Sequence, residues 1–112
     1  MRENCSHVII ENFFEPCVLF LLSNKKSYGY ELKKELVESC VCSVNTGNLY
    51  RGLSKLVKNG QIIKQKMKSE IGPDRVIYEI TDDGKRLLSE WINQLEKQNE
   101  VIANLIRKYK SL

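Results

Sequence analysis

The sequence predicts a mostly helical α+β fold, in which three helices precede one small β-hairpin and a long helix follows it. Two observations predict its central part: a helix-like run begins at Asn45, and two short runs of alternating apolar and polar residues meet at Gly72-Pro73, which predicts a hairpin. A third is charge, because residues 45–75 carry seven Lys and Arg against two Asp and Glu, while the segments on either side are nearly balanced. A helix followed by a basic hairpin is typical of a winged helix-turn-helix that binds DNA.

Length and composition indicate a single structural unit. A chain of 112 residues is long enough for one modest core, but too short for a cofactor domain plus a substrate domain. The longest apolar run, 17–22, is far shorter than the ~20 residues of a membrane span, and the first 22 residues do not resemble a secretory signal. We expect a soluble cytoplasmic protein with a DNA-binding part at 1–81 and a dimerisation helix at 82–112.

The first two predicted helices supply core. Residues 8–23 are rich in Val, Ile, Phe and Leu at helical offsets, and Pro16 is tolerated there only near a first turn or at a kink. After a loop at 24–26, Ser27 can cap a second helix that should end near Ser39. Its apolar positions are Tyr30, Leu32, Leu36 and Val37, which alternate with charged residues.

The third helix is the one predicted to read DNA bases. Asn45 is a plausible N-cap, and Asn59-Gly60 supplies the stop. Leu49, Leu53, Leu56 and Val57 form an inward stripe, which leaves a polar and cationic outer face. Asn and Arg side chains can make bidentate contacts to adenine and guanine edges in the major groove. The candidate contacts are Asn45, Thr46, Asn48, Tyr50, Arg51, Ser54 and Lys55; the alternative is a solvated helix face.

The predicted hairpin is a candidate phosphate-binding element. The first strand starts at Ile62 and carries Lys64, Lys66 and Lys68 at a period of two, and Arg75 follows the turn. Such cations bind phosphate without reading sequence, so binding should weaken steeply with salt. The alternative is that edge-strand lysines prevent aggregation.

The last helix is predicted from about Asp82 to Tyr109, with Thr81 as its cap and two acids in its first turn. A helix roughly 40 Å long overruns so small a domain, so its distal apolar face needs a partner. We expect a homodimer. The predicted dimer-interface residues are Phe13, Phe14, Leu88, Trp91, Leu95, Ile102, Leu105 and Tyr109.

Two further sites are weaker candidates. Phe14, Cys17, Trp91 and Leu95 could line an interfacial pocket for a flat apolar effector, although a large aromatic side chain at this spacing is more often dimer core. Cys40 and Cys42 lie just before the third helix and could form a thiol or metal switch, yet C-x-C spacing lacks the paired motif of a zinc site. We predict no metal and no cofactor.

Catalysis is not expected. The chain has one His, scattered carboxylates, no Gly-rich phosphate loop and no paired nucleophile and base. A second class stays open, a winged-helix module that binds protein and not DNA. The lysines of the hairpin favour DNA.

Several fragments, in order along the chain, resemble the PadR family of transcriptional regulators. They are Phe14-Glu15-Pro16, Ser27-Tyr28-Gly29-Tyr30-Glu31-Leu32, Thr46-Gly47-Asn48-Leu49-Tyr50-Arg51-Gly52-Leu53, the segment from Leu56 to Gly60 with Ile62, Gly72-Pro73-Asp74-Arg75 with Tyr78, and Ile80-Thr81-Asp82-Asp83-Gly84.

The resemblance implies a winged helix-turn-helix that dimerises through its first and last helices, binds palindromic operator DNA as a repressor and can be relieved by a ligand. It implies that the start of the third helix reads DNA and that Lys66, Lys68 and Arg75 lie on the wing. It adds Tyr28 as a contact to the DNA backbone, while Tyr30 should mainly pack.

Overall fold

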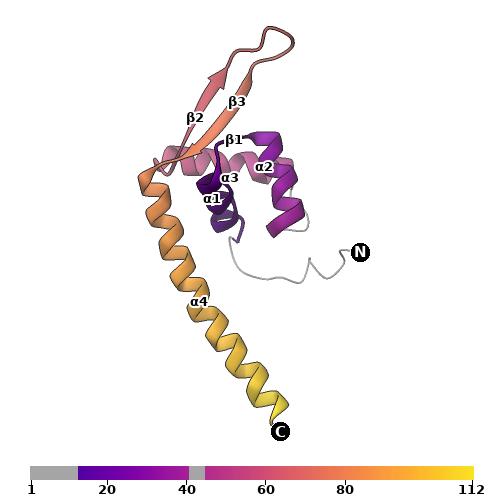
Figure 1. The fold of residues 1–112 in the computed structure, drawn as a ribbon, viewed down its shortest axis with the longest axis vertical. Coiled ribbons are helices and arrows are strands. Elements are labelled where there is room, and N and C mark those ends of the chain that lie inside the picture. The colour runs from indigo at the N-terminus through magenta and orange to yellow at the C-terminus, as the bar shows by residue number, and fades with distance from the viewer. Residues whose placement is uncertain (1–12, 41–44) are drawn as a thin grey trace.

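The computed structural model describes residues 13–40 and 45–112, and it confirms the α+β class. The helices and strands, in chain order, are α1 (Phe14–Asn24), β1 (Ser27–Tyr28), α2 (Gly29–Glu35), the π-helical η2 (Leu36–Cys40), α3 (Thr46–Lys58), β2 (Ile62–Met67), β3 (Arg75–Ile80) and α4 (Asp82–Lys110). Figure 1 shows α1, α2 and α3 gathered in a small body, from which the β2–β3 hairpin and α4 project in opposite directions.

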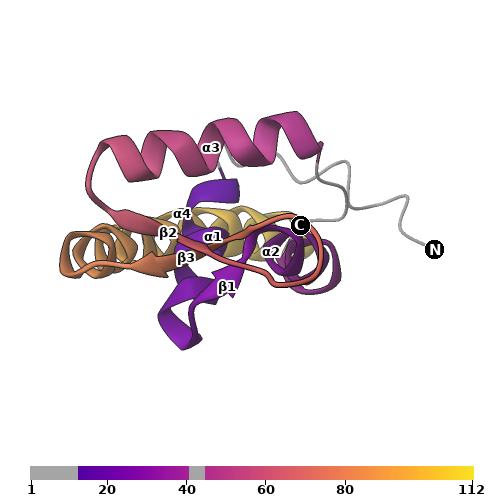
Figure 2. The same ribbon diagram turned by 90° about the horizontal axis from the view of Figure 1, so that it is seen from above.

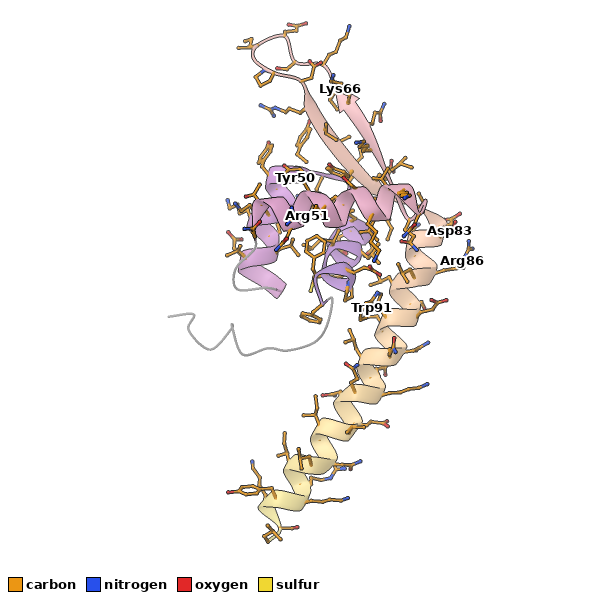
Figure 3. The ribbon with its side chains drawn as sticks, turned by 180° about the vertical axis from the view of Figure 1, so that it is seen from behind. Tyr50, Arg51, Lys66, Asp83, Arg86 and Trp91 are labelled. Carbon is orange, nitrogen blue, oxygen red and sulfur yellow. The ribbon has the colours of Figure 1, made fainter. Side chains whose placement is uncertain are left out.

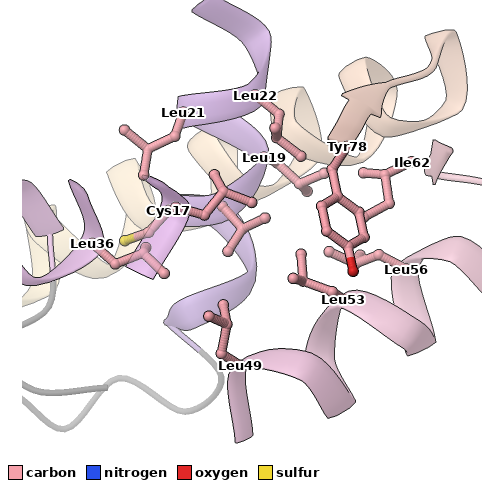
Figure 4. Close-up of a cluster of buried hydrophobic side chains, with 12 residues drawn as sticks. Cys17, Leu19, Leu21, Leu22, Leu36, Leu49, Leu53, Leu56, Ile62 and Tyr78 are labelled. Carbon is pink, nitrogen blue, oxygen red and sulfur yellow. The ribbon is translucent and has the colours of Figure 1, made fainter. Parts of the chain in front are cut away.

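The core is formed where buried side chains of α1, α3 and the sheet meet (Figure 4). The side chains of α1 from Pro16 to Leu19, together with Leu21 and Leu22, are buried. This burial explains why the helix has a nearly continuous apolar run and not an amphipathic pattern. Three leucines of α3 at helical spacing pack against it, as predicted. The remaining buried core residues are Leu32, Leu36, Ile62 and Tyr78.

The sheet has three strands, in the order β1-β3-β2, and both pairings are antiparallel. In the hairpin, Ile62 pairs with Ile80 at the base and Met67 pairs with Arg75 at the far end. The strand β2 is buried at Ile62 and exposed from Ile63 onward. Gly72 takes the positive φ of 93° that the turn requires.

The second helix differs from its prediction. Ser27 is not its cap but a residue of β1, 1% exposed and paired with Tyr78. The helix begins at Gly29, and its last part, Leu36–Cys40, is π-helical. The prediction that Tyr30 packs is wrong, because its side chain is 58% exposed.

The first helix begins later than the predicted range, at Phe14, and residues 8–12 of that range lie outside the described residues. Pro16 is its third residue. A proline in the first turn removes no hydrogen bond, because the N–H groups of that turn have no partner within the helix.

The direction of α4 is fixed where it leaves the sheet. Thr81 accepts a hydrogen bond from Gly84 N at 3.2 Å, which confirms its role as N-cap, and its hydroxyl donates to Gly60 O at 2.7 Å. Thr81 N donates to Gln61 O at 3.1 Å. Farther along, Trp91 Nε1 donates to Glu15 Oε1 of α1 at 2.9 Å. The first half of α4 is therefore joined to the turn between α3 and β2 and to α1.

Candidate nucleic-acid interface

We use "reading helix" for α3 and "wing" for β2, β3 and the loop 68–74 between them. Figure 2 shows the reading helix lying along one side of the molecule, and Figure 3 shows Tyr50 and Arg51 on it, with Lys66 on the wing. The reading helix and the wing are consecutive in the chain. Their exposed polar side chains thus come from adjoining elements.

The start of the reading helix is built as predicted. Asn45 Oδ1 accepts a hydrogen bond from Asn48 N at 3.1 Å, which confirms the N-cap. Thr46 Oγ1 accepts from Lys33 Nζ of α2 at 2.6 Å. This contact ties the first turn of the reading helix to the neighbouring helix.

The predicted base-reading side chains are all exposed. Asn48 Oδ1 accepts from Arg51 Nη2, so these two side chains, one turn apart, already lie together on the outer face. Both carry the planar hydrogen-bonding groups that recognise base edges. The exposed set is Asn45, Thr46, Asn48, Tyr50, Arg51, Ser54 and Lys55.

Tyr50 points from the reading helix toward α2. A methyl group built on Gly29 would lie 2.6 Å from the Tyr50 hydroxyl oxygen. Because Gly29 has no side chain, the Tyr50 ring fits beside the start of α2. The Tyr50 side chain is still 42% exposed.

The wing carries the predicted cations on its exposed surface. Lys64 and Lys66 lie on β2, Lys68 lies just beyond the strand, and Arg75 begins β3. Lys66 Nζ lies 3.9 Å from Asp74 Oδ2, and Asp74 Oδ1 accepts from Ser69 N at 3.2 Å. Asp74 thus helps to order the loop of the wing itself.

A hollow of about 420 Å³ lies between α2, the reading helix and the wing. Four tyrosines line it, and Arg75 and Asp74 lie at its wing side. Burial raises the pKa of Tyr78 above its ordinary value of 10.0, and the neighbouring Tyr50 raises it further. The sequence pointed to Tyr28, Tyr50 and Arg75 separately, and the fold brings them together. The lining residues are Tyr28, Gly29, Tyr30, Tyr50, Asp74, Arg75, Val76 and Tyr78.

The predicted dimer residues fall into two groups. Phe13, Phe14, Leu88, Trp91 and Leu95 are partly buried near α1, while the distal Ile102, Leu105 and Tyr109 are exposed.

The four predicted effector residues lie in different surroundings in the single chain. Cys17 lies in the core, 5% exposed. A different hollow of about 400 Å³, beside the start of α1, includes only Leu95 of the four. Its lining residues are Phe13, Ile92, Leu95, Glu96, Gln98, Asn99 and Ile102.

The predicted thiol switch cannot be placed. Cys42 lies outside the described residues, and the Cys40 side chain is not described. Within residues 13–40 and 45–112, no three His, Cys, Asp or Glu side chains gather in a group that could hold a metal ion. In the same residues, no helix is long and apolar enough to cross a membrane.

Sequence and structure comparisons place this geometry among known proteins. Residues 18–90 match the sequence profile described as the transcriptional regulator PadR-like family. No protein with a curated function matches the sequence. The structure is similar to a PadR-like transcriptional regulator from Bacillus cereus, with 30% identity, a TM-score of 0.75 and coverage of 86% of this chain and 93% of that one.

Two other solved structures extend the comparison. A Streptococcus transcriptional regulator has 30% identity and a TM-score of 0.72, with coverage of 82% of this chain and 90% of that one. Bacillus subtilis PadR, solved in complex with operator DNA, shares the fold at 22% identity and a TM-score of 0.66, with coverage of 74% of this chain and 48% of that one. The chain belongs to the PadR-like family of transcriptional regulators.

Proposed function

We propose that the protein is a sequence-specific DNA-binding repressor, which acts as a homodimer on a palindromic operator. The observation that carries the proposal is the exposed polar face of the reading helix beside a wing with four exposed cations. In this proposal the reading helix enters the major groove, and the wing holds the flanking phosphates. The DNA complex of Bacillus subtilis PadR, which has the same fold, supports this assignment.

The division of labour follows from the chemistry of the two elements. Asn48 and Arg51 lie together on the reading helix and present amide and guanidinium groups, which can discriminate bases. Lys64 and Lys68 take part in no ion pair within the described residues and lie on the projecting hairpin, where a cation meets phosphate.

The homodimer is supported by the distal half of α4. This helix has 29 residues, so it is about 44 Å long at 1.5 Å per residue. Trp91, in its first half, donates a hydrogen bond to Glu15 of α1, and the distal part projects away from the described body (Figure 1). Beyond Leu95 its apolar side chains face solvent, among them Ile102, Leu105 and Tyr109. Monomers rarely expose such a continuous apolar row, and a second copy of the same helix would cover it.

Dimerisation would give the two reading helices a fixed separation. Thr81 and Trp91 join α4 to the body, so pairing two α4 helices would place the two heads at a set distance. Two half-sites one helical turn apart, ~34 Å, fit such a dimer.

We also propose that a small apolar effector relieves repression. The hollow beside the start of α1 supports this, because Ile92, Leu95 and Ile102 make it largely apolar and it lies on the face assigned to the dimer. A ligand there would act through its different affinity for two arrangements of the dimer.

Two substitutions test the DNA assignment on a duplex that the wild-type protein selects from a random pool. Arg51→Ala should lose about 1–3 kcal/mol of binding free energy on the selected duplex and much less on random DNA. Lys68→Ala should weaken binding to both duplexes alike. It should also reduce the slope of log affinity against log salt concentration by about 0.9, because one phosphate is no longer neutralised.

Fluorescence anisotropy over a salt series would measure both effects. Lys97→Ala, a change of the same charge on the exposed face of α4, is the matched control. Equal losses on selected and random DNA for both variants would contradict the proposal. A wild-type protein that selects no DNA would favour a protein-interaction module.

A further inference from the structure

We infer that Tyr28, with Tyr30 stacked against it, is a positioning residue that holds the Arg75 guanidinium and the wing beside the reading helix. This role rests on the proposed DNA binding and goes beyond it, because Tyr28 acts through Arg75 and not by contact with DNA. Tyr30, which faces solvent where packing was expected, supports the Tyr28 ring.

The backbone of Tyr28 is fixed on both sides. It ends β1, where it pairs with Ile77 of the wing strand β3. Its N–H donates to Glu31 Oε1 at 2.9 Å, across the first turn of α2. The ring therefore starts from a point held by both the sheet and the helix.

Arg75 lies at the far end of the hairpin, two residues before Ile77, which pairs with Tyr28. It pairs with Met67 in the last rung of the hairpin before the loop 68–74. Its Cζ atom lies 5.6 Å from the centre of the Tyr28 ring, within the range of a cation–π contact. None of the ion pairs among the described residues includes Arg75, and the neighbouring Asp74 pairs with Lys66. In this proposal the contact with the Tyr28 ring orients this cation.

A guanidinium that stacks with its face on an aromatic ring keeps its donors available. The five N–H groups of Arg lie in the plane of the guanidinium, so a ring against the face leaves the edge free to bind phosphate. A lysine at position 75 would keep the charge and lose the planar group. This chemistry requires an arginine over an aromatic ring, and not merely a cation near DNA.

Tyr30 completes the platform. Its ring lies parallel to that of Tyr28, with an interplanar angle of 4° and centres 5.7 Å apart, which is the spacing of an aromatic pair. Both rings line the hollow that separates the wing from Tyr50 of the reading helix. The stack thereby spans from α2 to the wing across the surface assigned to DNA.

Binding to the selected duplex tests the proposal. Tyr28→Leu removes the ring and should weaken binding about fivefold, the loss expected for an exposed cation–π contact and its aromatic neighbour. Tyr28→Phe keeps the ring and should recover most of that loss. In an Arg75→Gln background, Tyr28→Leu should change affinity less than about twofold, because the group that it positions is gone.

Two results would overturn the role. If Tyr28→Phe lost as much affinity as Tyr28→Leu, the hydroxyl would be contacting DNA directly. If the losses of Tyr28→Leu and Arg75→Gln were additive, the two residues would act independently. Arg75→Lys is a second test, at an exposed position where the substitution should not disturb the fold. It should weaken binding about as much as Tyr28→Leu.

Hydrogen exchange in the free protein separates this role from DNA binding itself. Tyr28→Leu should speed exchange at the Arg75 and Ile77 amides, while Tyr28→Phe should leave both near the wild-type rate. Unchanged exchange in the Leu variant would refute the positioning role even if DNA binding holds. A wild-type protein that bound no duplex would refute the proposed function, and the exchange data would still decide the role of Tyr28.

Discussion

Replacing Leu105 by Ala tests the dimer through the energy of one apolar side chain. In the single chain Leu105 is 69% exposed, on the half of α4 that extends past α1. Full burial of a leucine contributes about 1.5–3 kcal/mol, so about two thirds of that, roughly 1–2 kcal/mol, is still available for an interface. A two-fold dimer contains Leu105 twice, so the burial free energy at stake is about 2–4 kcal/mol per dimer.

The expected consequence is a dimer dissociation constant raised by about 30-fold to several hundred-fold. Sedimentation equilibrium over a concentration series would measure it. Alanine favours helix, so α4 itself should persist, and circular dichroism would check this. Lys97→Ala on the same helix should leave the constant within about twofold. An unchanged constant in the Leu105 variant would refute the reasoning that this row of side chains lies at the interface.

Three smaller changes test how the fold is held. Asn45→Ala removes the N-cap of the reading helix and should lower the free energy of unfolding by about 1 kcal/mol in urea titrations; no change would mean that water replaces the cap. Gly84→Ala places a methyl group 2.1 Å from Gln61 O, a backbone atom, and should destabilise by about 1–3 kcal/mol, although alanine is the better helix former; a neutral result would show that this junction can shift. Because the pKa of Tyr78 is raised in the folded protein, its contribution to stability is present below pH 10 and lost as the pH rises past that value, so Tyr78→Phe should flatten the fall in stability at alkaline pH; an identical slope would show that Tyr78 does not cause it.

Local signals predicted much of the fold. The reading helix was predictable because its cap, its stop and its leucine stripe all lie within sixteen residues of sequence. The hairpin and α4 were predictable for the same reason, from a turn at Gly72 and from Thr81 before two acids. Each of these signals depends on neighbours in the chain.

Contacts between distant segments were not visible in the sequence. The strand β1 has only two residues, too few for a period, and its partner β3 lies about fifty residues later. Ser27 therefore resembled a helix cap, although it is buried in the sheet. The bond between Trp91 and Glu15 joins residues 76 positions apart, and no spacing rule indicates it.

The candidate site follows the same division. The exposed polar face of the reading helix and the lysines of the wing could be predicted from spacing and charge. The association of Tyr28, Tyr30 and Arg75 could not, because it depends on how β1 brings the start of α2 against β3. Tyr30 was expected to pack because it occupies an apolar position in the helical pattern of the second helix. Its exposed ring instead forms part of an aromatic stack.

The most direct test of the proposed function is to sequence the DNA that the purified protein selects from a random pool. A dimer with two reading helices predicts a palindromic site whose half-sites are centred about 10 base pairs apart. Arg51→Ala should blur the preferred bases within each half-site and leave the spacing unchanged. Enrichment of a single half-site, or of no sequence at all, would contradict the proposal that this chain binds operator DNA as a dimer with two reading helices.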